Sequence, residues 1–562
     1  MSHRFSKTRT TDAAPALRQA LVRATLTICG LALFWQLGMQ DLHSLTKAAA
    51  FTLIANAGLA GVQLLLHQRR VVALGALVLN SLVLLNATVE GFLFWLYGLA
   101  PKNIVVADAI LGSNANEVRE FIESYSVHLG LVVLLALGLM ALLAWVERRF
   151  NAIATDAPPG NRRDRVIGTT MLALFAALHI NDTMAQENPL VYWPAYYADY
   201  RSQRDTLADV RHQVAGALVK AQGYKTAYVG PARQTLVLVL GESVNRSNWS
   251  LYGYPRNTTP QLDLRRDQML VFPNVLSSDA ATAASLLKML TPATRDQPEA
   301  WRTEPNVLAL ARNAGYHVTW LSNQEQGDGP IQILAEHAHE QIFVNNGHGR
   351  AASSLDEQML PHLERVLAGP APRKLIVVHM LGAHLRYELR YPAAYGVFTG
   401  AKDSVTDGMV TAGRPFWVRK ARNQYDNAMR YTDHVLDTII QKASDTPAAG
   451  AMAVLYVSDH GQEVGHYSNF YGHSTKHPSG YQVPLLLWTN DKAPLPAAAR
   501  TALQDRGYRT DYLDHTLLGL LHIQSCFYRP DHDVLSNRFV RPGPPAGALL
   551  ASATAPCKLP AT

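Results

Sequence analysis

The sequence has few cysteines, three among 562 residues. Cys29 lies in an apolar run, which leaves Cys526 and Cys557 as one candidate disulfide pair near the C-terminus. No cysteine cluster has zinc-finger spacing. The basic N-terminal residues precede an apolar stretch without a small-residue cleavage site, so we expect an uncleaved membrane anchor and no signal peptide.

The chain has no acidic excess: its formal net charge is +7 and its pI is about 9.1. A basic balance can indicate nucleic-acid binding, but here the arginines of the first half cluster between hydrophobic segments. Membrane topology explains that clustering, because positive residues flank spans on the cytoplasmic side. Nucleic acid is therefore excluded as the expected partner.

Long hydrophobic runs fill the first third of the chain. A bilayer core of about 30 Å needs roughly 20 apolar residues in a helix, and five stretches meet this length, at 20–39, 48–66, 71–97, 126–146 and 166–184. Their basic flanks alternate in a way that puts the N-terminus in the cytoplasm and everything after residue 185 outside. We expect a multi-pass protein of a bacterial inner membrane with a periplasmic C-terminal half.

The membrane half contains two polar residues that could contact a lipid headgroup. Asn86 and Glu90 lie one helical turn apart near the outer end of the third span. An ionisable residue at membrane depth suggests a site, although Glu90 can equally sit at the interface. The acidic stretch 113–125 that follows allows the same two readings, a headgroup contact or a solvated helix.

The sequence predicts three regions: a transmembrane domain of five helices over 1–184, an interfacial linker over 185–233, and a periplasmic domain over 234–562. Aromatic residues typical of a membrane interface open the linker, at Tyr192, Trp193, Tyr196, Tyr197 and Tyr200. In the last region, apolar strands at 235–242, 317–323, 374–379 and 451–461 alternate with helical stretches. This pattern predicts an α/β domain with a mostly parallel central sheet.

Acidic and histidine side chains follow two of these strands. Glu242 ends the first strand, and Asp459 with His460 ends the last. Ligands of parallel sheets collect beyond the carboxyl ends of the strands. Two carboxylates and one imidazole there form a set that zinc or manganese accepts. Both motifs are expected to open helices.

Several segments together resemble the phosphoethanolamine transferases, membrane-anchored members of the alkaline phosphatase/sulfatase superfamily. The matching segments are GESVNRSNWSLYGYPRNTTPQLD (241–263), VLSSDAATAASLLKMLT (275–291), GAHLRYELRYP (382–392), VSDHGQEVG (457–465) and FYGHS (470–474). The resemblance implies a sulfatase-like fold for the periplasmic domain. It also implies that Glu242, Thr282, Asp459 and His460 bind zinc, with Thr282 as the nucleophile.

The resemblance further implies that phosphoethanolamine passes from phosphatidylethanolamine to Thr282 and then to lipid A, the lipopolysaccharide core or another periplasmic glycan. His384 and His473 would act as acid and base, and a second metal held by histidines stays open. Without the flanking matches, Thr282 would be interpreted as a structural residue at a helix start, with its hydroxyl bonded to the backbone. His473 also has neighbouring competitors in His466 and His477.

The sequence departs from the family at two places. Ser278 and Lys288 stand where many members have a cysteine pair, and SNQEQGDG (322–329) stands where the lipid A enzymes have Asn-Asn-x-Gly. A branch that acts on the lipopolysaccharide core fits at least as well as the lipid A branch. A phosphoglycerol transferase of the lipoteichoic acid synthase type and a non-catalytic membrane scaffold are the alternatives. No Cys/Ser-x-Pro-x-Arg signature of a sulfatase nucleophile is present.

Overall fold

A computed structural model gives the structure of the chain. It describes residues 13–37, 42–66, 68–97, 115–153, 162–180, 182–198, 214–216, 219, 221, 223–224, 226–326, 329–345, 354–400, 402–446, 450–490, 503 and 506–542. The chain divides into two compact units. One comprises Met1–Ala107 and Tyr125–Arg204, and the other comprises Asp108–Ser124 and Asp205–Thr562.

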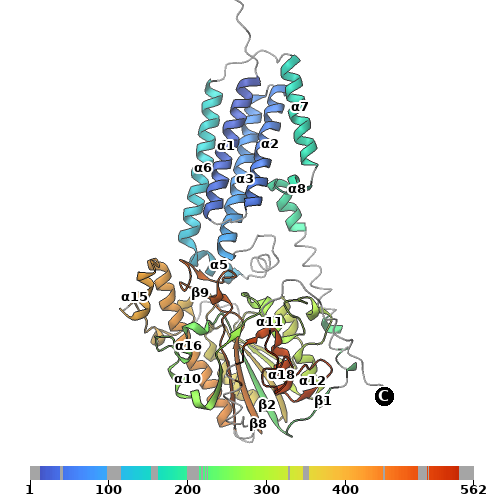
Figure 1. Cartoon of the computed structure of the whole chain (residues 1–562), viewed down its shortest axis with the longest axis vertical. Coiled ribbons are helices and arrows are strands. Elements are labelled where there is room, and N and C mark those ends of the chain that lie inside the picture. Colours follow the sequence, from blue (N-terminus) through green and yellow to red (C-terminus); the bar gives the residue numbers. More distant parts are fainter. Residues whose placement is uncertain are drawn as a thin grey trace, which may run out of the picture. The chain divides into compact units, whose positions relative to one another are not determined.

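The first unit consists of helices (Figure 1): α1 (Ala13–Leu37), α2 (Leu42–Leu66), α3 (Arg69–Tyr97), α6 (Ser126–Ile153), α7 (Arg162–His179) and the short α8 (Asp182–Ala185). Among the described residues, α1, α2, α3 and α6 are long and apolar enough to cross a membrane. The predicted fifth span, 166–184, differs. Its helix α7 starts four residues earlier, with three arginines and an aspartate, and ends at His179, so its apolar part is shorter than predicted.

Several buried polar side chains of this helical unit pair with one another across helices. The guanidinium of Arg23 on α1 forms a buried ion pair with Glu147 on α6. Thr27 donates to Asn80 Oδ1 at 2.8 Å, and Asn80 and Asn56 exchange hydrogen bonds between α3 and α2. Because lipid offers no alternative partner, such contacts specify which helices pack together.

The predicted linker is described in part. Residues 189–198 are helical, and the ring of Tyr192 packs against Trp193 and Tyr196. Tyr200 and most of the predicted polar helix at 201–222 lie outside the described residues.

Cys557 of the candidate disulfide pair also lies outside the described residues, whereas Cys526 is disulfide-bonded and Cys29 is free.

The second unit is built around a seven-stranded sheet in the order β3-β11-β8-β2-β7-β5-β6. β2 (Gln234–Gly241), β5 (His317–Ser322), β6 (Glu340–Phe343), β7 (Arg373–His379) and β8 (Ala451–Ser458) pair in parallel. β11 (Leu485–Thr489) is antiparallel to β8 and to β3 (Met269–Phe272). The expected mostly parallel sheet is confirmed, with its four predicted strands in the centre.

Helices cover both faces of this sheet (Figure 1). α11 (Thr282–Leu290), α12 (Val307–Asn313), α13 (Pro330–Ala335) and α18 (Leu513–Leu520) share one apolar core with Leu236, Leu238 and Leu240 of β2. These leucines alternate along the strand and therefore point to one face. Further helices of the unit are α10 (Pro260–Leu264), α14 (Leu360–Ala368), α15 (Ser404–Thr411) and α16 (Phe416–Asp445).

Short strands and one extra helix complete the unit. β1 (Ala227–Tyr228) pairs with β13 (Ile523–Gln524), β4 (Val275–Leu276) with β12 (Tyr508–Arg509), and β9 (Glu463–Val464) with β10 (Tyr471–Gly472). The helix is α5 (Ala115–Ser124), which comes from the acidic segment between the third and fourth spans. It joins this unit through an ion pair between Glu123 and Arg386, a contact that its amphipathic pattern did not indicate.

Candidate metal centre and nucleophile

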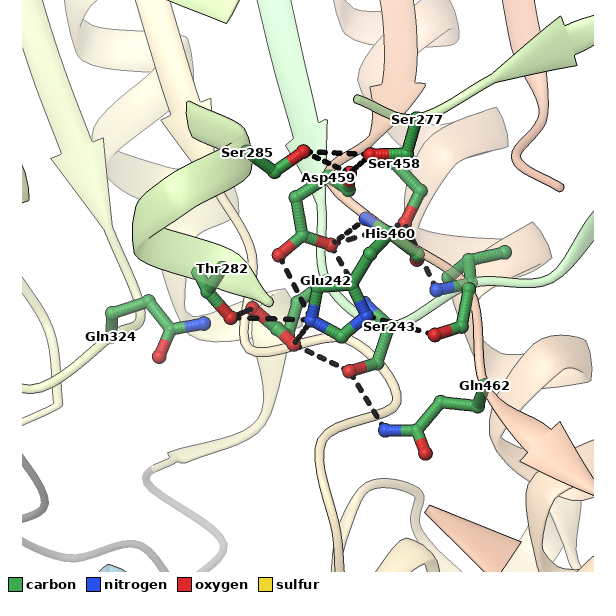
Figure 2. A network of polar contacts seen from close by, with 12 residues as sticks. Glu242, Ser243, Ser277, Thr282, Ser285, Gln324, Ser458, Asp459, His460 and Gln462 are labelled. Carbon is green, nitrogen blue, oxygen red and sulfur yellow. Dashed lines mark hydrogen bonds and ion pairs between the residues drawn. The ribbon is translucent and has the colours of Figure 1, made fainter. Parts of the chain in front are cut away.

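Two neighbouring parallel strands end at the candidate metal centre. Glu242 follows β2, and Asp459 and His460 follow β8, so sheet pairing brings the three side chains together. All three are buried, and one potential ligand atom from each lies within 4.8 Å of the others. His460 Nε2 is 3.6 Å from Glu242 Oε1 and 3.5 Å from Asp459 Oδ2. Figure 2 shows them converging beside Thr282.

The polar atoms at this centre are arranged as a cation would require. Asp459 Oδ1 accepts hydrogen bonds from the backbone amides of Ser243 (2.9 Å) and His460 (2.6 Å), whereas its Oδ2 is buried and has no hydrogen-bond partner in the described structure. His460 Nδ1 is 2.8 Å from the carbonyl of Gly461. That contact fixes the proton on Nδ1 and leaves the lone pair of Nε2 directed into the centre. The residues present therefore fit a zinc ion.

The nucleophile candidate sits at the first residue of helix α11. Thr282 Oγ1 donates to Glu242 Oε2 at 3.1 Å and lies 3.4 Å from His460 Nε2. The segment is a helix start, but the hydroxyl contacts the acidic and imidazole groups of the centre. One turn later, Ser285 Oγ donates to the carbonyl of Asp459 at 2.5 Å. That bond holds the helix in register with the ligands.

Burial raises the pKa of Glu242 well above its usual value, and the nearby Asp459 carboxylate raises it further. Two carboxylates at this separation repel each other when both are charged. A bound cation reverses this effect and holds both in their charged forms. The electrostatics of the centre thus favour a metal as much as its geometry does.

The backbone after β2 turns sharply beneath the ligands. Ser243 adopts a positive φ of 63°, an uncommon conformation for a residue other than glycine. Its hydroxyl donates to Glu242 Oε1 and accepts a hydrogen bond of 2.9 Å from the side-chain amide nitrogen of Gln462. After Gln462 the chain enters the β9–β10 hairpin, while short 3₁₀ turns follow Glu242. The expectation that both motifs open helices holds only for Glu242, which two short 3₁₀ helices follow; the Asp459–His460 motif leads into β9.

The two predicted histidines lie together beside the centre. The ring centroids of His473 and His460 are 4.5 Å apart, and those of His473 and His384 are 6.2 Å apart. Burial, with Arg390 and His460 nearby, lowers the pKa of His384 to about 3. Burial, with His460 and His384 nearby, lowers the pKa of His473 well below its usual value. Both rings are therefore neutral at neutral pH and able to accept a proton or ligate a metal.

The competing histidines of this segment have other partners. His466 Nε2 lies 2.8 Å from Asn248 Oδ1, and the ring of His477 stacks on Tyr467. The structure therefore brings His473, and neither competitor, next to His460.

A buried carboxylate that the sequence did not reveal holds the segment carrying His384. Asp356 accepts hydrogen bonds from the amides of Leu381 (2.8 Å) and Gly382 (2.9 Å). Gly382 has a φ of 52°, and a Cβ there would lie 2.6 Å from the carbonyl of Glu242. This close approach needs glycine. The isolated Asp356 stands 25 residues before the contact in sequence, and no local motif signals its role.

Gln324 is a second residue that the sequence did not single out. Its amide nitrogen donates to the carbonyl of Met380 at 2.7 Å, and Figure 2 shows its side chain beside Thr282. It belongs to the segment 322–329 that departs from the Asn-Asn-x-Gly pattern. A polar amide consequently borders the nucleophile.

Asn86 and Glu90 belong to the helical unit, on α3. The Oδ1 atom of Asn86 is buried and has no hydrogen-bond partner within the described residues. Glu90 is half-buried. Their role toward a headgroup stays a prediction.

An ion pair occurs where many members of the family have a cysteine pair. Lys288 Nζ binds the carboxylate of Asp279, and the amide of Ser278 donates to Thr510 at 3.0 Å. The ion pair spans the chain from just before Thr282 to the last turn of α11. It braces the nucleophile segment over nearly the same interval as a disulfide between residues 278 and 288.

Comparison with known proteins gives consistent matches. The sulfatase family matches residues 234–523. The chain is 30% identical to phosphoethanolamine transferase EptC of Escherichia coli K12 over 460 residues, 76% of each chain. The crystal structure of the C-terminal periplasmic domain of Escherichia coli EptC, in complex with zinc, superposes with a TM-score of 0.52 at 32% identity, over 57% of this chain and 91% of that domain.

The likeness of fold includes the helical unit. The integral membrane lipooligosaccharide phosphoethanolamine transferase A of Neisseria meningitidis superposes with a TM-score of 0.62 at 20% identity. The match covers 95% of this chain and 99% of that one.

We expect the Asp459→Asn variant to bind zinc at least about tenfold more weakly than the native chain, because it removes a charged ligand. Affinity should also fall as the pH is lowered through the raised pKa of Glu242, since the metal must displace that proton. Zinc titration of the purified, chelator-stripped protein measures both effects.

Asp433→Asn is the matched control. Asp433 is buried as well, but its carboxylate accepts hydrogen bonds from the amides of Gln261 and Leu262 at the start of α10. Native zinc affinity in Asp459→Asn, or equal loss in both variants, would contradict the assigned centre.

The Lys288–Asp279 pair generates a second prediction. Lys288→Met and Asp279→Asn should each lower the free energy of unfolding, and the double variant should lose less than the sum, with a coupling of about 1 kcal/mol. Denaturant unfolding of the three variants measures this coupling. Additive losses would show that the pair does not brace the segment.

Proposed function

The chain belongs to the phosphoethanolamine transferases of the sulfatase family, and we propose that it transfers phosphoethanolamine from phosphatidylethanolamine to an acceptor on lipopolysaccharide, either lipid A or the core, or on another periplasmic glycan. The reaction would proceed in two steps through a phosphorylated Thr282. The observation that carries this proposal is the hydroxyl of Thr282, within hydrogen-bonding distance of Glu242 and His460.

In the first step, Thr282 Oγ1 attacks the phosphorus of the donor lipid. The bond between phosphorus and the diacylglycerol oxygen breaks. The proton that Thr282 Oγ1 loses passes to the neutral imidazole of His384 or His473 and from there to the departing oxygen, which leaves as the alcohol. A threonine hydroxyl needs activation, and the Oγ1–Glu242 contact shows which carboxylate receives its hydrogen bond. Thr282 opens a nine-residue helix, so the first free amides of α11 lie beside the phosphoryl oxygens that the step brings in.

Glu242, Thr282, Asp459 and His460 would hold the zinc ion. Zinc lowers the pKa of a hydroxyl and offsets charge on phosphoryl oxygens in the transition state. Asp459 and His460 are held for this purpose by backbone contacts, which leave one oxygen and one ring nitrogen directed inward.

In the second step, an acceptor hydroxyl attacks the phosphorus bound to Thr282. Its proton goes to a neutral imidazole, and Thr282 Oγ1 is released and regains a proton. His384 and His473 suit this task because both rings are neutral at neutral pH. The ring of His473 lies 4.5 Å from that of His460, so we assign proton transfer at Thr282 Oγ1 to His473 and proton transfer at the acceptor hydroxyl to His384. Histidines holding a second metal would be an extension of the same cluster.

The membrane location supports a lipid donor. Four candidate spans keep the chain in the bilayer, and the arginine distribution predicts that the sheet-containing unit is periplasmic. Asn86 and Glu90 are the proposed contacts for the zwitterionic headgroup. Gln324 belongs to the segment 322–329 that departs from the pattern of the lipid A enzymes, so a core sugar fits as acceptor at least as well as lipid A.

Replacing the nucleophile tests the proposal. We expect Thr282→Ala to lower transfer by about 10³-fold or more, as nucleophile losses do, because no covalent intermediate can form. Incubation of the native chain with phosphatidylethanolamine and no acceptor should place phosphoethanolamine on the peptide that contains Thr282. Mass spectrometry detects this adduct and the released diacylglycerol.

Thr282→Ser is the matched control, since it retains a hydroxyl at the same position and should still form the adduct. Full transfer by Thr282→Ala, or an adduct on a different residue, would overturn the mechanism. Release of diacylglycerol without any adduct or transfer would indicate direct hydrolysis.

A further inference from the structure

The helical hairpin formed by α15 and α16 exposes large apolar side chains at its tip. Val410 is 54% exposed, Phe416 66% and Trp417 48%. We call these three residues the hairpin tip. Tyr467 of the adjacent β9–β10 connection is also 51% exposed. A water-soluble surface seldom gathers two large aromatic side chains in sequence at such exposure.

Basic residues accompany the hairpin tip. Lys420 is exposed one turn after Phe416, and Arg419 is half-buried beside it. Aromatic side chains interleaved with lysine and arginine are typical of segments that lie at a membrane surface, where the rings enter the headgroup region and the cations contact anionic lipid. The composition of the tip thus matches a bilayer.

The hairpin is fixed to the segment that follows the metal ligands. Arg414, in the α15–α16 turn, donates to the carbonyls of Gly465 (2.9 Å) and His466 (3.2 Å). Gly465 has a φ of 83°, and a Cβ there would lie 2.6 Å from Val418 and 2.7 Å from Met409. The hairpin therefore packs directly against the turn after β9.

The same β9–β10 hairpin is tied to a residue at the edge of a membrane span. Val464 of β9 pairs with Tyr471 of β10, and the Tyr471 hydroxyl donates to the carbonyl of Ser124 at 2.7 Å. Ser124 ends α5, and α6, a candidate span, begins two residues later. Figure 1 shows α5, β9 and α15 at the same end of this unit.

We propose that the hairpin tip inserts into the headgroup region of the bilayer that holds the spans, as a second attachment of the sheet-containing unit. Chain continuity brings Ser124 to the membrane edge, Tyr471 brings β10 to Ser124, and Arg414 brings the tip to β9. The β9 strand that carries this attachment ends at Val464, four residues after His460 in the sequence. It keeps the candidate metal centre at a constant depth relative to lipid headgroups.

Membrane depth at the tip tests this inference in the full-length chain. Phe416→Cys is made in a Cys29→Ala background, spin-labelled, and placed in nanodiscs of phosphatidylethanolamine and phosphatidylglycerol. We expect the label to collide more with oxygen than with a water-soluble nickel chelate, because oxygen concentrates in lipid. Leu264→Cys, at an 87% exposed apolar residue that ends α10, is the matched control and should show the reverse preference.

Two results would overturn the inference. A label at residue 416 as open to the nickel chelate as the label at residue 264 would place the tip in water. A label shielded from both reagents would place the tip against a protein. This measurement needs no catalysis, so its outcome is separate from that of the proposed function.

Activity gives a second measurement, which rests on the proposed function. The double variant Phe416→Ser, Trp417→Ser should lower kcat/KM toward a donor embedded in bilayers by roughly tenfold through lost positioning, and should leave kcat/KM toward a short-chain donor in solution unchanged. Equal loss toward both donors would contradict the attachment. Absence of transfer by the native chain would sink the proposed function and leave the depth result standing.

Discussion

The repulsion between two buried carboxylates is the constraint on which the periplasmic architecture depends. Glu242 and Asp459 are held beside each other at the ends of adjacent strands, with an unpartnered oxygen of Asp459 directed at His460. Burying such a pair without a cation costs several kcal/mol per ion. The surrounding hydrogen bonds nevertheless fix both groups in place, and a cation bound between the two carboxylates would offset their repulsion.

The other parts of the centre are arranged around these strand ends. The hydrogen bond from Ser285 Oγ to the carbonyl of Asp459 positions helix α11, so that Thr282 lies beside Glu242 and His460. Asp356 fixes the turn at Gly382 against Glu242, and this turn presents His384. The candidate metal ligands, Thr282 and the two histidines thus share a single backbone framework, in which a shift of one element moves the others.

Sequence patterns predicted the elements with strong periodicity or strong composition. Continuous apolar runs located β2, β5, β7 and β8, and family motifs located Thr282, His384 and His473. The contacts that the sequence did not reveal join distant segments. Asp356 accepts a hydrogen bond from Leu381, 25 residues later, and Glu123 pairs with Arg386, 263 residues later. Helix α7 begins four residues before the predicted span 166–184, with the charged residues 162–165, and ends five residues before that span does, at His179.

Locating the cation directly tests the central claim. Crystals of the full-length chain grown with zinc, with anomalous data collected at the zinc absorption edge, should show a peak bonded to Glu242, Asp459 and His460 at about 2.0–2.2 Å, with Thr282 Oγ1 facing it. An anomalous peak elsewhere, with these three side chains bonded only to water or to one another, would contradict the account.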